Sequence, residues 1–470
     1  MNTAFLWIVF PGLMAVIFLI FRNRSRFIPI LGALTAIAIA SSATWVRLAE
    51  RWTIGPLSIT INDTWIFLGR RFELGTGDRP VVIILYLAAA FWFAAVPVIE
   101  VNSLFVPLGL GMTALLTAAI AVNPFLYAAM LIEMAVLISI PFLTQPGERA
   151  GRGVLRYLTY QTLGMPFILF TGWMLAGVET GTASLQLIGR ASILLALGFT
   201  FLLAVFPFHT WIPMIIQESN PFPAAFVLLM LPGAVLFLAI GFLGRFAWLR
   251  TSETTYQALR AAGLLMVISA GLWAAFQRDL ARILGYAVIL EIGFSLVAIS
   301  LSEEAGSSRF LEILFASLMP RGLAMGLWSL ALAVIRSHRG SLRLEDVRGA
   351  AWDHPVASAG LLLANFSLAG LPLLASFPVR LALLEGLGET SSLAAFGALL
   401  GSIGLLAGGL RTLSSLITGP EERVWRSFES WSQRLYLGIG GVALLLVGLF
   451  PQFFLLFFAK MPSVFGLPAP

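Results

Sequence analysis

Apolar residues fill long stretches of this chain, and polar residues are concentrated in the short segments between them. About 20 apolar residues suffice to cross roughly 30 Å of hydrocarbon as an α-helix. Such stretches recur from Phe5 to Ala459, and we count about fourteen of them. The first, within Met1 to Phe21, has neither a basic start nor a small-residue cleavage site, so we expect it to remain as a spanning helix. The pattern predicts an all-α polytopic membrane protein.

Composition supports this class of protein and limits the kinds of site that the chain can form. With 59% hydrophobic and only 11% charged residues, the chain cannot be a soluble domain. It has no cysteine, which excludes disulfides, thiolate metal sites and iron–sulfur ligation on this chain. We expect no cofactor, no metal and no catalysis by the chain alone. The net charge of +6 suits lipid headgroups better than nucleic acid, which we exclude as a partner.

Arginines cluster in alternate connections between the predicted helices. They are Arg22, Arg24, Arg26, Arg149, Arg152, Arg156, Arg278, Arg282, Arg336, Arg339, Arg343, Arg348, Arg411, Arg423, Arg426 and Arg434. The positive-inside rule places these connections in the cytoplasm and both termini outside it, which we expect to be in a bacterial cytoplasmic membrane. On the other side, the long connection from Ala49 to Pro80 contains the alternating run PLSITIND, which predicts a short hairpin.

Paired prolines predict two interrupted helices. Pro207 and Pro213 fall in the seventh predicted helix, and Pro372 and Pro378 fall in the twelfth, about 165 residues later. We expect a single domain with N-terminal helices in 1–101, inverted five-helix repeats in 102–250 and 251–418, and a C-terminal helix in 419–470. Interrupted helices in inverted repeats expose backbone groups where transporters build ion sites. The alternative is that the prolines only kink packing helices.

Several motifs around these prolines resemble one family. They are NPFLYAAMLIEMAVL at 123–137, PFHTWIP at 207–213, ESNPFPAAF at 218–226, QRDLARILGYAVILEIGF at 277–294, LRLEDVRG at 342–349 and FSLAGLPLLASFPVR at 366–380. The chain resembles the antiporter-like membrane subunits of respiratory complex I, membrane-bound hydrogenases and multisubunit cation/proton antiporters. The resemblance covers nearly the whole chain, and it implies a proton path through the membrane midplane.

The resemblance also implies that several bases of this path are missing. Glu133 stands at the family's fifth-helix glutamate, but Leu202 stands at the lysine that this glutamate pairs with. Other departures are Ala281 for a lysine, Glu291 for a histidine or glutamine, and Arg321 and Arg380 for the lysines of the eleventh and twelfth helices. A buried lysine can exchange a proton, whereas arginine stays charged.

The proton-path candidates are therefore Glu133, His209, Glu291, Arg321 and Arg380. We expect Arg321 and Arg380 to act as fixed charges. Glu133 is predicted to be a titratable group facing a wet cavity, with a protonated or paired relic as the alternative. For Glu291, a path residue and a structural pair with another helix stay open. We expect His209 to cap the interrupted helix by donating to free carbonyls, rather than to carry protons.

These observations predict a membrane subunit of a multisubunit complex, with inherited proton translocation that is impaired or altered. One alternative is a scaffold subunit that does not pump, and another is the membrane subunit of an inorganic-carbon uptake system. The expected partners are other membrane subunits and lipids. If the parent complex is a NAD(P)H- or ferredoxin-dependent oxidoreductase, this chain would be a non-catalytic part of it.

Overall fold

A computed structural model describes residues 2–23, 27–46, 51–54, 57–60, 62–145, 147–175, 185–302, 309–419 and 427–458. Arg24, Arg26, Arg423 and Arg426, which contribute to the predicted arginine pattern, lie outside these residues. Nine of the described helices are long and apolar enough to cross a membrane, so the protein is a multi-pass integral membrane protein. They are α2 (Ile28–Trp45), α3 (Arg79–Ala95), α5 (Ala128–Leu143), α9 (Pro221–Arg245), α11 (Glu253–Phe276), α12 (Leu280–Leu301), α13 (Arg309–Arg339), α17 (Ser392–Ile417) and α18 (Trp431–Leu449).

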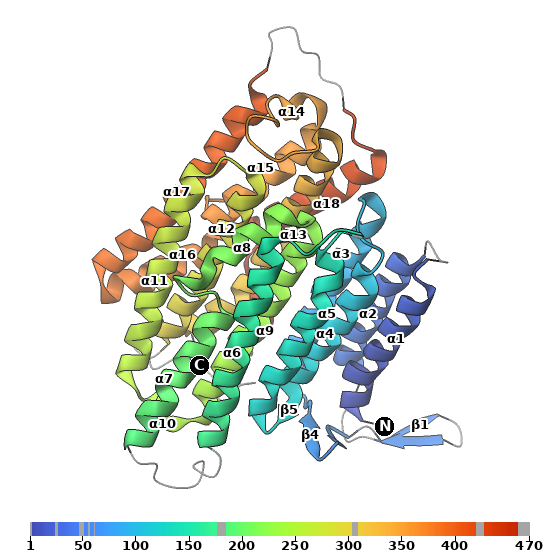
Figure 1. The fold of residues 1–470 in the computed structure, drawn as a ribbon, viewed down its shortest axis with the longest axis vertical. Helices are drawn as coiled ribbons and strands as arrows, with labels where there is room; N and C mark the ends of the chain where they lie inside the picture. The colour runs from blue at the N-terminus through green and yellow to red at the C-terminus, as the bar shows by residue number, and fades with distance from the viewer. Residues whose placement is uncertain are drawn as a thin grey trace.

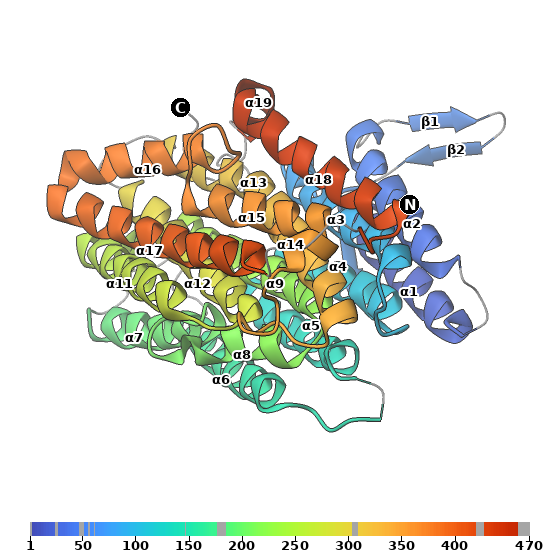
Figure 2. The same cartoon turned by 90° about the horizontal axis from the view of Figure 1, so that it is seen from above.

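The remaining helices are shorter or more polar. They are α1 (Phe10–Phe21), α4 (Phe105–Ala121), α6 (Arg152–Met174), α7 (Leu185–Leu202), α8 (Trp211–Glu218), α10 (Ala247–Arg250), α14 (Ala350–Asp353), α15 (Pro355–Ala369), α16 (Phe377–Thr390) and α19 (Gln452–Phe458). The long helices run side by side, with α1 and α2 at one flank and α11 and α17 at the other (Figures 1 and 2). α12 is the most enclosed, with 94% of its apolar window buried.

Short strands occupy one end of the molecule. β1 (Arg51–Ile54) pairs antiparallel with β2 (Leu57–Thr60), and β3 (Thr64–Phe67) pairs with β4 (Arg70–Glu73), which also pairs with β5 (Val122–Asn123). The predicted hairpin is thus confirmed for the residues LSIT, and a second hairpin follows it. The strands and α10 lie at the end opposite α14 (Figure 1).

Connections rich in arginine meet at the α14 end. Leu280 N–H donates to Leu342 O at 2.9 Å, and Arg411 donates to the carbonyl of Gln277 at 3.2 Å. Arg336 donates to Ser219 O at 2.6 Å, at the C-terminal end of α8. Four connections far apart in sequence are therefore joined on one face, as the alternation of arginines predicts.

Both predicted helix interruptions are present. The chain leaves the helical conformation after Leu202 and resumes it in α8, and it leaves it again after Ala369 and resumes it in α16. Pro207 and Pro372 lie in the interruptions, whereas Pro213 and Pro378 lie in the first turns of α8 and α16. Since proline lacks an N–H, the carbonyls four residues before Pro207 and Pro372 have no helical donor.

Candidate functional site

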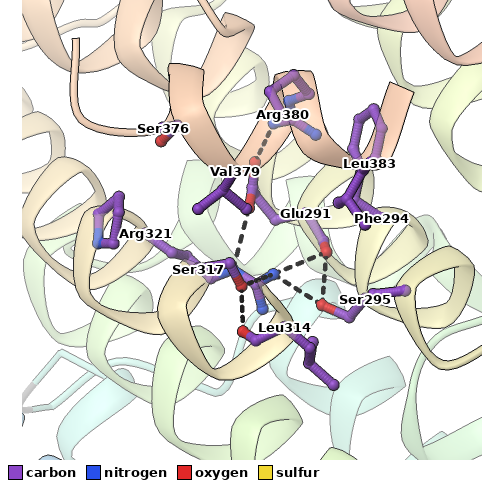
Figure 3. Close-up of a pocket in the computed structure, with 12 residues that line it drawn as sticks. Glu291, Phe294, Ser295, Leu314, Ser317, Arg321, Ser376, Val379, Arg380 and Leu383 are labelled. Carbon is purple, nitrogen blue, oxygen red and sulfur yellow. Dashed lines mark hydrogen bonds and ion pairs between the residues drawn. The ribbon is translucent and has the colours of Figure 1, made fainter. Parts of the chain in front are cut away.

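A buried ion-pair cluster joins three helices at the centre of the candidate site. Arg321 of α13 donates through Nε to Glu291 Oε2 of α12 at 3.1 Å. Arg380 of α16 donates through Nη2 to the other carboxylate oxygen, Oε1. The arginines thus hold opposite sides of one carboxylate (Figure 3). All three side chains are only 5–6% exposed.

Further donors and acceptors fix the position of Arg321. Its Nη2 donates to the backbone carbonyl of Glu291 at 3.0 Å and to Ser295 Oγ at 2.7 Å. Ser295 lies one helical turn after Glu291, so both present their side chains on the same face of α12. Ser317, one turn before Arg321 on α13, lies 3.5 Å from the same nitrogen. The guanidinium is therefore held by groups from two helices.

The helix interruption supplies an acceptor for Arg380. Leu368 O would accept from residue 372 in a continuous helix, but that residue is Pro372 and has no N–H. Arg380 Nη2 donates to this carbonyl at 2.8 Å. Its guanidinium carbon also lies 3.6 Å from the centre of the Phe294 ring, a cation–π contact. The interruption is thus part of the ion-pair cluster.

Glu133 and Leu202 lie on another part of the molecule, against α6. Thr162 Oγ1 donates to Glu133 Oε1 at 2.6 Å. Leu202 is 2% exposed, and a Cβ added to Gly164 of α6 would lie 2.7 Å from its side chain. Gln161 Nε2 donates to the Leu202 carbonyl at 3.2 Å, at the end of α7. In both interrupted helices, then, a side chain from elsewhere binds a carbonyl at the interruption.

The other residues identified from the sequence lie outside the cluster. His209 is 7% exposed and stacks on Phe206 at a centroid distance of 5.4 Å. It makes no hydrogen bond to the residues that the structure describes, and its Nδ1 is buried without a partner, so the predicted capping role is wrong. The backbone N–H of buried Ala281 donates to the Asp279 carboxylate at 3.0 Å, which caps α12.

A cavity of about 380 Å³ lies on the hairpin side and was not predicted from the sequence. Its polar lining includes Glu73, Asp78 and Arg245. Burial raises the pKa of Asp78 to about 6, and a hydrogen bond from the backbone N–H of Gly75 opposes this shift. Ile132, the residue before Glu133, also lines the cavity. This partly polar cavity therefore reaches α5 from the hairpin side.

Sequence reasoning identified the three charges of the cluster but left their pairing open. The structure brings Glu291, Arg321 and Arg380 together and favours the structural-pair interpretation of Glu291. Ser295 and the Leu368 carbonyl were missed. The spacing of four residues from Glu291 and the missing N–H of Pro372 were the signals for them.

Residues 129–405 match the family model described as NADH:quinone oxidoreductase/Mrp antiporter, TM. A relative named NADH-quinone oxidoreductase subunit N, from Buchnera aphidicola, is 28% identical over 280 residues, which cover 57% of this chain and 56% of the relative. The chain thus spans little more than half the length of that relative in the alignment.

Solved structures match over nearly the full chain. A chain of respiratory complex I from Thermus thermophilus gives a TM-score of 0.78 at 18% identity, covering 99% of this chain and 98% of its own. A chain of the archaeal membrane-bound sulfane sulfur reductase gives 0.81 at 16% identity, covering 98% and 97%. At these identities the likeness establishes a common fold.

Proposed function

Because the chain belongs to the NADH:quinone oxidoreductase/Mrp antiporter family of membrane proteins, we propose that it is a membrane subunit of a multisubunit complex whose own proton path is interrupted. The inherited role is proton translocation. The main observation in support of an interrupted proton path is the Glu291 cluster. In it, two arginines occupy the places where the resemblance implies proton-exchanging lysines.

The cluster favours a fixed arrangement over proton relay. Relay needs groups that take up and release a proton, and the guanidinium of arginine does not do so near neutral pH. The carboxylate of Glu291 is bound on both oxygens by arginines, so protonating it would displace one charge-assisted hydrogen bond and remove the negative charge that strengthens the other. The cluster therefore behaves as a set of fixed charges.

The region around Glu133 supports an interruption of the proton path at a second place. In the expected path, Glu133 exchanges its proton with a lysine on the next broken helix. Here the partner position is Leu202, packed against Gly164, and Glu133 binds the Thr162 hydroxyl instead. A leucine offers neither a charge nor a proton, so a relay would need water to bridge it.

The proposal includes the finer architecture. We propose fourteen spans, made of the nine long helices together with α1, α4, α6, the interrupted pair α7–α8 and the interrupted pair α15–α16. Helices α4 to α9 and α11 to α17 would form the inverted repeats, since the fourth span of each set is interrupted. The face that carries the arginines would lie in the cytoplasm and both termini outside it.

Copurification tests the subunit assignment. The chain, tagged and extracted in a mild detergent, should copurify with other integral membrane proteins in fixed stoichiometry, identified by mass spectrometry. A well-folded chain that elutes alone under several mild detergents would contradict the assignment. An unrelated multi-pass protein with the same tag, purified in parallel, controls for nonspecific association.

A further inference from the structure

The Glu291 cluster carries an excess of one positive charge in the protein interior. Arg321 and Arg380 contribute two fixed positive charges and Glu291 one negative charge, with each side chain at least 94% buried. Among the described residues, the other buried carboxylates are Glu429, which is 4% exposed, and Asp279, which is 9% exposed. Asp279 caps α12 and Glu429 binds the first N–H groups of α15, so both are engaged at helix ends. An uncompensated buried charge is strongly unfavourable.

The two arginines also have unused hydrogen-bond donors. All their bonds to the part of the chain that the structure describes use Arg321 Nε, Arg321 Nη2 and Arg380 Nη2. The Nη1 amino group of each arginine therefore has no partner there, and neither has the buried Nε of Arg380. Guanidinium donors bind negatively charged acceptors most strongly.

A small cavity lies between these arginines. Its volume is about 10 Å³, close to the space that one water molecule needs. The lining includes Glu291, Arg321, Arg380, Ser317 and Ser376. The Ser317 hydroxyl already donates to Leu314 O at 2.6 Å, so the donors that face the cavity beside the carboxylate are the guanidinium groups and the Ser376 hydroxyl. Ser376 is the N-cap of the 14-residue helix α16, whose N-terminus adds a partial positive charge to the same region.

From the excess charge, the unused donors and the cavity together, we propose that the cavity binds a monovalent, halide-sized anion, with chloride as the physiological candidate. The anion would balance the second arginine and accept hydrogen bonds from guanidinium groups and from the Ser376 hydroxyl. A halide is larger than a water molecule, so the apolar side chains that also line the cavity, such as Leu314 and Val379, would have to move slightly to admit it, whereas sulfate would not fit. This inference stands independently of the parent complex, because it rests on the charges and contacts of this chain.

Anion-dependent thermal stability tests the proposal on the purified full-length protein with its copurifying subunits. Chloride is titrated against gluconate at constant pH and ionic strength, and the melting temperature is measured. A bound anion stabilises the folded state in a saturable manner. The melting temperature of the wild type should rise with chloride, bromide should replace chloride, and sulfate should not.

Three variants locate the site. Arg380→Gln leaves a neutral Glu291–Arg321 pair, so the chloride dependence should be lost. Glu291→Gln leaves two positive charges, and the chloride concentration giving half of the stabilisation should fall by about tenfold or more. Arg411→Gln is the matched control, since Arg411 is an exposed arginine that binds backbone carbonyls, and its chloride dependence should equal that of the wild type.

The opposite results would overturn the proposal. Absence of chloride dependence in the wild type would mean that water alone occupies the cavity. An unchanged dependence in Arg380→Gln, or equal stabilisation by sulfate, would place the anion effect elsewhere on the protein. If Glu291→Gln does not fold, Arg380→Lys replaces it, because it keeps the charge and should retain the chloride dependence that Arg380→Gln loses.

Discussion

At the scale of single residues, the identity of the basic side chains decides the chemistry of the site. Either a lysine or an arginine could pair with a buried carboxylate such as that of Glu291, but only lysine releases a proton when it is desolvated. The chain has 29 basic residues, and of these only Lys460 is a lysine. Proton exchange by a basic side chain is therefore excluded from the cluster, and its arginines act through charge and hydrogen bonds.

Removing the carboxylate should destabilise the fold strongly. In Glu291→Gln at low chloride, two buried guanidinium groups lose their shared counter-charge, and breaking a buried ion pair in this way typically costs about 3–5 kcal/mol. The melting temperature in detergent should fall clearly below that of the wild type. The control is Glu385→Gln, at an exposed position on α16. Equal melting temperatures for the two variants would contradict a structural role for the cluster.

Restoring one base should not restore a proton path. Leu202→Lys places an amine against Gly164 of α6, the helix whose Thr162 donates a hydrogen bond to Glu133. The arginines around Glu291 remain, so we expect proton uptake by the reconstituted assembly to stay within about 20% of the wild type, which corresponds to a change of less than about 0.1 kcal/mol in the barrier. A severalfold rise in uptake would show that Leu202 was the only interruption. Leu202→Met, which conserves volume without a charge, controls for packing.

At the scale of secondary-structure elements, the prolines at the interruptions explain how part of the site is formed. The missing N–H of Pro372 frees the Leu368 carbonyl, and Arg380 occupies it. The paired prolines allowed both interruptions to be predicted from the sequence. Sequence could not show which side chain binds a carbonyl at each interruption, because Gln161 and Arg380 approach from elements whose packing depends on the whole fold.

Glycines allow a close contact between α11 and α17. A Cβ at Gly271 of α11 would lie 2.0 Å from the backbone oxygen of Gly401 on α17. Backbone atoms cannot move aside as a flexible side chain can, so Gly271→Ala should separate the two helices and cost about 1–3 kcal/mol. Thermal unfolding measures the effect. Gly233→Ala on α9, where the added Cβ meets nothing within 4 Å, should leave the melting temperature unchanged or raise it, and equal losses in both variants would contradict this account.

At the scale of the whole molecule, the alternation of arginines along the chain predicted which connections share a face. The structure joins those connections by hydrogen bonds such as Leu280 N–H to Leu342 O. Charge counts along the sequence suffice for this because each span reverses the direction of the chain. The same counts could not predict the cavity at Asp78, which depends on how the strands pack over α4 and α9.

Single cysteines test the proposed orientation, because the parent chain has none. Thr76→Cys lies on the hairpin side and Glu345→Cys on the arginine-rich side, both at exposed positions. An impermeant maleimide should label Thr76→Cys in intact cells and Glu345→Cys only after permeabilisation. Labelling of denatured protein controls for reactivity. The reverse pattern would invert the proposed topology.

The central claim is that protons do not cross the membrane through this chain, and driven proton uptake by the intact assembly in liposomes tests it most directly. Wild type and Glu133→Gln are compared at equal subunit stoichiometry, with Glu253→Gln, at an exposed position at the start of α11, as the control. We predict equal uptake for all three, because the neighbouring subunits would carry the protons. Loss of uptake in Glu133→Gln alone, with assembly unchanged, would place a working proton path in this chain and contradict the account.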